Sequence, residues 1–383
     1  MISYDLLSQF GSLTDGALTV EKSFSLSSKD DMGAGCLIIS ALSSYTGKKA
    51  PKISFSLIAD GQNEPFYISH SYRIGKKEEY TGQSWRIPPM FLPKMKLTVS
   101  VDIPDGTELR IKNFGTSHDL GMRTQNAPMP LRHNAHLGFW GLAPDNTMPA
   151  FELAAASGFQ HCIVVPKVTK DGKFVCIHDD TINRTARDKD GNAPTEPIYV
   201  WDKGYDELLG WEYGSYKDKI YNGTKLPLLS DFFDLCQKTG MTPMFSTHPG
   251  LSVEEWKAVK EMLSCRGLLK KFHIKSFGIE ILQTAYSVFG AEIDGYTFDI
   301  GGWKDSHIET LQNSGIDAKS SRVGIEVQFD EYTEDIARSI INAGFFASAW
   351  NIKRRDFDEY EKLISWGVRE FTEDYHCSMG LNY

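Results

Sequence analysis

The chain has 383 residues and a formal net charge of −9, with 41% hydrophobic and 24% charged residues, which is the composition of a folded globular protein. Acidic and basic residues are interspersed, so the charge pattern argues against a nucleic-acid backbone as the main partner. No apolar run approaches the roughly 20 residues that a membrane-spanning helix needs. The length predicts two domains.

The amino-terminal stretch MISYDLLSQFGSLTDG contains neither a basic segment nor an apolar segment of the signal-peptide type. We therefore expect no cleaved signal, which leaves two locations open: the cytoplasm, or the cell surface by a route without a visible signal. The six cysteines are scattered, without a CxxC pair or a zinc-ligand spacing. We expect them to act as small buried side chains.

Residues 1–122 are predicted to form an all-β sandwich of jelly-roll-like type. Short β-type runs alternate with turn signals such as Asp60-Gly61 and Pro104-Asp105-Gly106, and long helical periodicity is absent. The runs lie at 37–39, 53–58, 65–68, 96–101 and 108–112. Residues 123–130, which complete the polar stretch GMRTQNAPMP, are predicted to be a linker.

From residue 131 to residue 383 the pattern changes to strands that alternate with helices, which indicates a parallel sheet. The predicted strands include 242–247, 272–277, 295–300, 323–328 and 345–350, and the predicted helices include 229–239, 252–263, 280–289, 334–342 and 356–366. The number of repeats is about the eight that a TIM (β/α)8 barrel requires in some 250 residues. We therefore predict an α/β TIM barrel over 131–383.

The stretch from His136 to Thr185 carries an ordered set of motifs. A His-Leu-Gly turn is followed by Pro-Asp-Asn-Thr, an apolar helix up to Gly158, a strand, a Thr-Lys-Asp-Gly turn and His178-Asp179. This order resembles the signature of the glycerophosphodiester phosphodiesterase family, written roughly as HRG, PENT, ExDV, TxDG and HDxxxxRTT. The carboxyl-terminal sequences GFFASAWNI and GVREFTEDY resemble the closing strands of that family.

The resemblance implies that His136 and His178 are the acid and base that hydrolyse a phosphodiester of glycerol. Imidazole suits this chemistry because it titrates near neutral pH and can both accept and donate a proton. The alternative is that the two histidines are structural remnants of the family pattern. The implied partner is a glycerophosphodiester or a glycerophosphate polymer.

The family also uses a divalent cation, such as Ca²⁺ or Mg²⁺, whose ligands are two acidic residues of ExDV and a glutamate on the next strand. The resemblance places these three positions on Ile163, Val165 and Ser246, and the arginine of HRG on Leu137. The hydrocarbon side chains of Ile163 and Val165 cannot coordinate a hard cation, which takes oxygen ligands, and the strand of Ser246 offers no carboxylate in any nearby register. We therefore expect no metal ligand and no cofactor.

Cationic and aromatic side chains remain near the expected substrate site. Lys167 lies at the carboxyl end of its strand, where its ammonium group could replace the cation, with His248 as a second positive group and Arg184 as a phosphate ligand. The simpler alternatives are a solvated Lys167 and an Arg184 that only supports the scaffold. Trp350 is predicted to form an aromatic wall of the site, the alternative being a core residue.

Two functions remain open from the sequence. One is a divergent phosphodiesterase that works with a histidine pair and without the metal site. The other is an inactive binding module for glycerophosphate- or sugar-containing polymers, with carbohydrate as the ligand of the β-sandwich. A glycosidase-like carboxylate pair, Asp299 and Glu326, is a weaker third hypothesis that rests only on their position at strand ends.

Overall fold

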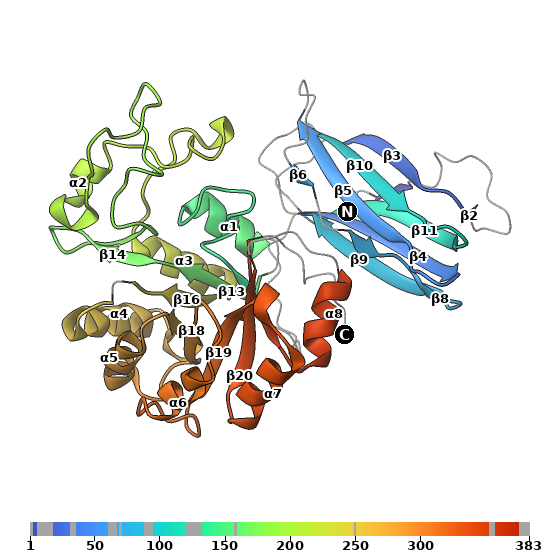
Figure 1. Cartoon of the computed structure of the whole chain (residues 1–383). Coiled ribbons are helices and arrows are strands. Elements are labelled where there is room, and N and C mark those ends of the chain that lie inside the picture. The colour runs from blue at the N-terminus through green and yellow to red at the C-terminus, as the bar shows by residue number, and fades with distance from the viewer. Residues whose placement is uncertain are drawn as a thin grey trace. The chain divides into compact units, whose positions relative to one another are not determined.

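The computed structural model describes residues 3–5, 18–30, 36–59, 67–68, 71–87, 95–119, 132–156, 159–248, 250–351 and 357–374. The chain divides into two compact units, one with the amino-terminal strands and one with the barrel (Figure 1). The predicted linker, 123–130, lies outside the described residues. The boundaries of the domains therefore stay a prediction.

The described residues of 1–122 are all-β, as predicted, and form two sheets. The first sheet contains β1 (Ser3–Asp5), β2 (Leu18–Val20), β4 (Cys36–Thr46), β8 (Lys76–Lys77), β9 (Thr81–Ile87) and β11 (Glu108–Asp119). The second contains β3 (Phe24–Asp30), β5 (Lys52–Ala59), β6 (Tyr67–Ile68), β7 (Tyr72–Arg73) and β10 (Met95–Asp102). The ring of Phe55 on β5 lies 5.7 Å from that of Trp85 on β9, so the sheets share one core.

Strand β10 illustrates why the sequence alternates. Leu97, Val99 and Val101 are buried, whereas Thr98 and Ser100 between them are only partly buried. Successive side chains of a strand point to opposite faces, so the apolar set faces the core. The predicted turn after this strand is confirmed by a hydrogen bond from the amide of Thr107 to the carbonyl of Pro104, 3.0 Å long.

The second unit is a closed barrel of eight parallel strands within the described residues, which confirms the predicted TIM barrel. The strands are β12 (Arg132–Ala135), β13 (His161–Val164), β16 (Thr242–Ser246), β17 (His273–Ser276), β18 (Gly295–Asp299), β19 (Arg322–Gln328), β20 (Phe346–Asn351) and β21 (Glu370–Glu373). Each strand pairs with the next, and β12 closes the barrel against β21, with Ala135 opposite Glu373. We call the end at which these strands finish the mouth.

Helices follow most of the strands (Figure 1). They are α1 (Met148–Ala156), α3 (Leu229–Thr239), α4 (Val253–Cys265), α5 (Ile279–Phe289), α6 (Ser306–Gln312), α7 (Glu334–Asn342) and α8 (Phe357–Ser365). Gly240 ends α3 with a φ of 75°, and Ser252 begins α4 with the predicted capping box to Glu255. None of the helices in the described segments combines the length and the apolar character needed to cross a bilayer.

Of the four cysteines whose side chains the structure describes, three follow the expectation of burial. Cys162, Cys176 and Cys236 are buried free thiols within the barrel unit. Cys265 is exposed because it is the last residue of α4.

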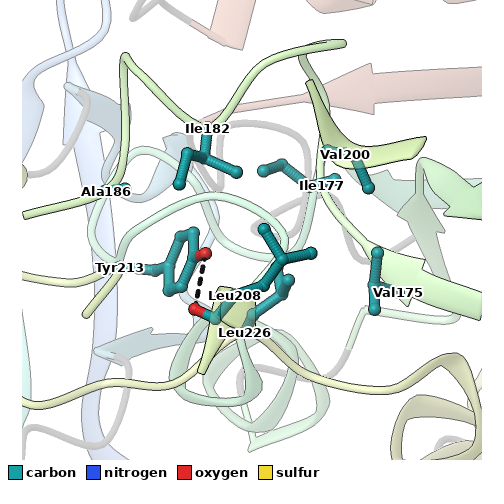
Figure 2. Close-up of a cluster of buried hydrophobic side chains, with 8 residues drawn as sticks. All are labelled: Val175, Ile177, Ile182, Ala186, Val200, Leu208, Tyr213 and Leu226. Atoms are coloured by element: carbon teal, nitrogen blue, oxygen red, sulfur yellow. Dashed lines mark hydrogen bonds between the residues drawn. The ribbon is translucent and has the colours of Figure 1, made fainter. Parts of the chain in front are cut away.

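A segment that the sequence did not predict as a folded unit follows the hairpin of β14 (Pro166–Val168) and β15 (Phe174–Cys176). It runs from residue 177 to residue 228, includes the short helix α2 (Tyr205–Leu208), and appears in lime green in Figure 1. We call it the insertion. Figure 2 shows its own apolar core, in which the hydroxyl of Tyr213 donates to the carbonyl of Leu208 over 3.0 Å. The core side chains are Val175, Ile177, Ile182, Ala186, Val200, Leu208, Tyr213 and Leu226.

Candidate active site

Two histidines lie at the mouth of the barrel, each hydrogen-bonded to a carboxylate. His136 directly follows β12, and its Nδ1 lies 2.6 Å from Oδ1 of Asp374, which follows the neighbouring strand β21. His178 follows β15, and its Nδ1 lies 2.8 Å from Oδ1 of Asp179. Because Nδ1 is engaged, Nε2 of each ring is the nitrogen that remains for a substrate. The side chains of His136 and His178 are 22% and 36% exposed, so both can be reached.

The loop after His136 holds an unusual backbone conformation. Leu137 and Asn146 have φ values of 55° and 54°, which non-glycine residues rarely adopt, and Gly138 has a φ of 80°. A Cβ atom on Gly138 would lie 2.6 Å from Cβ of Ala150, so only glycine fits between the loop and α1. The side chain of Asn146 accepts a hydrogen bond of 2.9 Å from the amide of Val165, which fixes the loop to the barrel.

Three of the four positions that the resemblance assigns to charged groups lie in an apolar cluster at the mouth. Leu137, Ile163 and Val165 are buried there with Met244, and Trp140 packs against them. The fourth position, Ser246, is the last residue of β16. Since the side chains of this cluster carry no oxygen, they do not fit a hard cation, which takes oxygen ligands. Across the described ranges, no three His, Cys, Asp or Glu side chains gather closely enough to hold a metal ion.

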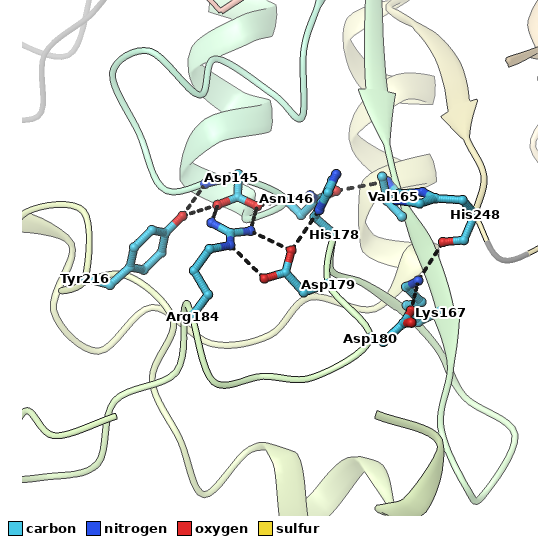
Figure 3. Close-up of polar contacts among 10 residues, drawn as sticks. All are labelled: Asp145, Asn146, Val165, Lys167, His178, Asp179, Asp180, Arg184, Tyr216 and His248. Carbon is cyan, nitrogen blue, oxygen red and sulfur yellow. Dashed lines mark hydrogen bonds and ion pairs between the residues drawn. The ribbon is translucent and has the colours of Figure 1, made fainter. Parts of the chain in front are cut away.

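Arg184, predicted as a phosphate ligand, lies between two carboxylates (Figure 3). Its Nη1 and Nη2 donate to the two oxygens of Asp145, each over 2.9 Å, and its Nε donates to Asp179 over 2.7 Å. Burial tends to raise the pKa of the Asp145 carboxyl, but Arg184 and the hydroxyl of Tyr216 hold it below its ordinary value. Through Asp179, this ion pair also supports the carboxylate partner of His178.

Lys167 is the middle residue of the hairpin strand β14, and its side chain is only 5% exposed. The Nζ atom donates to Oδ1 of Asp180 over 2.5 Å and to the carbonyl of His248 over 2.7 Å (Figure 3). The ring of His248 lies 5.1 Å from that of His178. Burial and the neighbouring positive groups, His178 and Lys167, lower the pKa of His248, which favours its neutral form.

Trp350 lies at the end of β20, where it shares the inward-facing side of the strand with Ser348. Its Nε1 is buried and has no hydrogen-bond acceptor among the described residues. As a residue, Trp350 is only partly buried. This placement leaves the aromatic-wall prediction open.

Asp299 and Glu326 lie on adjacent strands, as the glycosidase hypothesis requires, but Lys275 lies between them. Nζ of Lys275 is 3.1 Å from Oδ2 of Asp299 and also contacts Glu326. Hydroxyl groups of Ser348 and Thr372 donate to the same glutamate. Burial raises the pKa of the Asp299 carboxyl, against the opposing effect of Lys275. The group forms an enclosed ion cluster inside the barrel rather than an open carboxylate pair.

Three residues of the site were not recognised in the sequence. Asp374 could have been found as a carboxylate directly after the last predicted strand, in FTEDY. Tyr216 and Lys217 belong to the insertion, which has no periodic pattern that would place them. The hydroxyl of Tyr216 contacts Asp145, and Nζ of Lys217 donates to the carbonyl of Trp140 over 2.7 Å.

Comparison with protein families and curated proteins gives a consistent result. Residues 136–283 match the glycerophosphoryl diester phosphodiesterase family. The chain is 25% identical over 248 residues to YqiK, an uncharacterized protein of Bacillus subtilis strain 168, which covers 63% of this chain and 93% of YqiK. It is 26% identical over 202 residues to a glycerophosphodiester phosphodiesterase of Bacillus altitudinis, covering 50% of this chain and 76% of that protein.

Solved structures share the fold of the barrel. A phosphodiesterase of Oleispira antarctica, solved with its product sn-glycerol-3-phosphate, aligns with a TM-score of 0.54 and 22% identity over 64% of this chain and 93% of its own. A glycerophosphodiester phosphodiesterase of Agrobacterium tumefaciens strain C58 aligns with a TM-score of 0.51 and 16% identity over 64% and 96% of the two chains. The family match and the curated relatives support the assignment of the barrel region to the glycerophosphoryl diester phosphodiesterase family, whose solved structures share its fold.

Proposed function

We propose that the protein hydrolyses phosphodiesters of glycerol with His136 and His178 as acid and base, and without the cation site of the family. The observation that carries this proposal is the pairing of each Nδ1 with a carboxylate, at 2.6 Å and 2.8 Å. A carboxylate fixes the tautomer and the orientation of an imidazole and stabilises its protonated form. Such a pair supplies the two proton transfers that the reaction needs.

The reaction can proceed through a neighbouring hydroxyl of the glycerol group. One histidine accepts the hydroxyl proton as that oxygen bonds to phosphorus, and the bond from phosphorus to the leaving alkoxide breaks. The other histidine donates its proton to the leaving oxygen, which departs as an alcohol, and a cyclic phosphodiester remains. Water then opens the cyclic ester with the two histidines in exchanged roles.

The apolar cluster supports the metal-free part of the proposal. Three of the four positions that would carry charge in the family pattern, Leu137, Ile163 and Val165, are hydrocarbon side chains that pack together with Met244, and the fourth is Ser246. A single substitution would leave the other charged groups buried and unpaired, which is costly. Here the charged groups are replaced together, and the apolar side chains that replace them pack against one another. This is expected if the protein works without the cation.

A binding module for glycerophosphate-containing polymers is the second candidate. The same cluster favours it, because charge near the phosphate is a large part of phosphoryl-transfer catalysis. In that case the paired histidines would only position the ligand. A carbohydrate ligand for the β-sandwich belongs to this second candidate and remains a prediction.

Turnover and binding measured side by side separate the two candidates. The purified protein is incubated with glycerophosphocholine and with a poly(glycerol phosphate) chain, and product release is followed while calorimetry records binding. We expect product release from at least one of these compounds. Saturable binding without product from either one would support the binding module and contradict the hydrolase.

A further inference from the structure

Lys217 extends from the insertion to the mouth of the barrel. Its Nζ donates to the carbonyl of Trp140 over 2.7 Å and lies 6.0 Å from the centre of the Trp140 ring. The ring of Trp140 in turn stands edge-on to the ring of His136, with centroids 5.7 Å apart. The ammonium group therefore lies on the same side of the mouth as the His136–Asp374 pair.

Neighbouring contacts fix the backbone on both sides of Lys217. The amide of Asp145 donates to the hydroxyl of Tyr216 over 2.9 Å, and that hydroxyl also contacts the carboxylate of Asp145. The hydroxyl of Tyr221 donates to the carbonyl of Leu142 over 2.9 Å. The lysine thus projects from an anchored segment, which limits the entropy lost when it binds a ligand.

The charge of Lys217 is not balanced locally, unlike that of the other cations at the mouth. Arg184 is paired with Asp145 and Asp179, and Lys167 is paired with Asp180. For Lys217, the described residues provide a backbone carbonyl and no ion pair. Burial lowers its pKa, and the more distant Asp145 and Asp374 offset this only in part.

An ammonium group has three N–H donors, and the carbonyl of Trp140 uses one of them. A partly buried cation without a counter-ion gains free energy when an anion arrives. Leu137 and the rest of the apolar cluster carry no charge, so they cannot attract an anion to this part of the mouth.

We propose that Lys217 binds an anionic phosphoryl oxygen of the substrate beside His136, and so supplies positive charge that the apolar cluster lacks. This inference rests on the proposed phosphodiester substrate. It makes the insertion part of the active site, because the insertion contributes the lysine that recognises the phosphate.

The test compares Lys217→Met with Lys219→Met, which removes the same charge from an exposed side chain two residues further along the same segment. Calorimetry measures the dissociation constant of inorganic phosphate and of sn-glycerol-3-phosphate for each variant. We expect affinity to fall on the order of 10- to 100-fold in Lys217→Met, the range for a hydrogen bond to a charged group. Lys219→Met should bind within about twofold of the wild type, a change below the effect of one such bond. Equal affinities in both variants would overturn the inference.

A measurement on the unmodified protein guards against a variant that fails to fold. With ¹⁵N-labelled lysine, NMR titration should show the pKa of Lys217 rising when phosphate is added, because the anion stabilises the charged form. An unchanged Lys217 titration at saturating phosphate would contradict the inference. Phosphate binding through Lys217 without any diester turnover would contradict only the proposed hydrolysis, whereas turnover unaffected by Lys217→Met would contradict only the role of Lys217.

Discussion

Replacing His136 by alanine is expected to lower kcat/KM for glycerophosphodiester hydrolysis by roughly 10²- to 10⁴-fold, the contribution typical of general acid–base catalysis. The same range is expected for His178→Ala, because each histidine has its Nδ1 held by a carboxylate and its Nε2 left for the substrate. Steady-state kinetics on glycerophosphocholine measures both losses. The double variant should lose less than the product of the two single losses, since acid and base act as a unit.

His307 provides the matched control for this prediction. Its Nδ1 accepts a hydrogen bond of 3.1 Å from the amide of Lys304, outside the two histidine–carboxylate pairs. We expect His307→Ala to retain kcat/KM within about threefold, far below the range for an acid–base group. A loss as large as that of His136→Ala, or full activity in both His136→Ala and His178→Ala, would contradict the assignment.

Asp145→Ala is expected to lower the free energy of unfolding more than any other substitution proposed for this protein. The carboxylate is buried and accepts two hydrogen bonds from Arg184 and one from Tyr216, so its removal leaves a guanidinium with Asp179 alone. Breaking a buried ion pair costs about 3–5 kcal/mol, and the partial exposure of Arg184 reduces this to roughly 2–4 kcal/mol. Chemical denaturation of wild type and variant measures the difference in the free energy of unfolding.

The same carboxylate contributes to acid sensitivity. Its pKa in the folded state lies below the ordinary value of 3.8, so its contribution is present above pH 3.8 and is lost as the pH falls through the folded pKa. The variant should lack this part of the pH dependence. Tyr216→Phe, which removes only the hydroxyl group, should cost about 1 kcal/mol. An Asp145→Ala protein as stable as Tyr216→Phe would contradict the role of the ion pair.

Much of the barrel could be predicted because its strands and helices follow local patterns. The helices 229–239 and 334–342 were predicted at the bounds that the structure has, since caps and apolar periodicity mark both. Helix α6 was missed because it has only 7 residues. The insertion was missed because its core side chains come from loops and very short helices and strands, where no period indicates burial.

The sequence indicated the two histidines of the candidate site, but it did not indicate how the charged side chains of the site are paired. The motif order identified His136, His178 and the apolar residues at 163 and 165. It could not show that Arg184 is held by Asp145, because these residues are 39 positions apart and meet only in the folded chain. The partner of His136 is 238 positions away. Ion pairing between such distant residues decides which cations remain available for a substrate.

The most direct test of the metal-free account is hydrolysis before and after exhaustive removal of divalent cations. Glycerophosphocholine turnover is measured in untreated protein, in protein dialysed against chelator, and after Ca²⁺ or Mg²⁺ is restored. Because Ile163 and Val165 offer no ligand atom, we expect the same kcat/KM in all three samples. Activity that disappears with the chelator and returns with Ca²⁺ or Mg²⁺ would contradict the account.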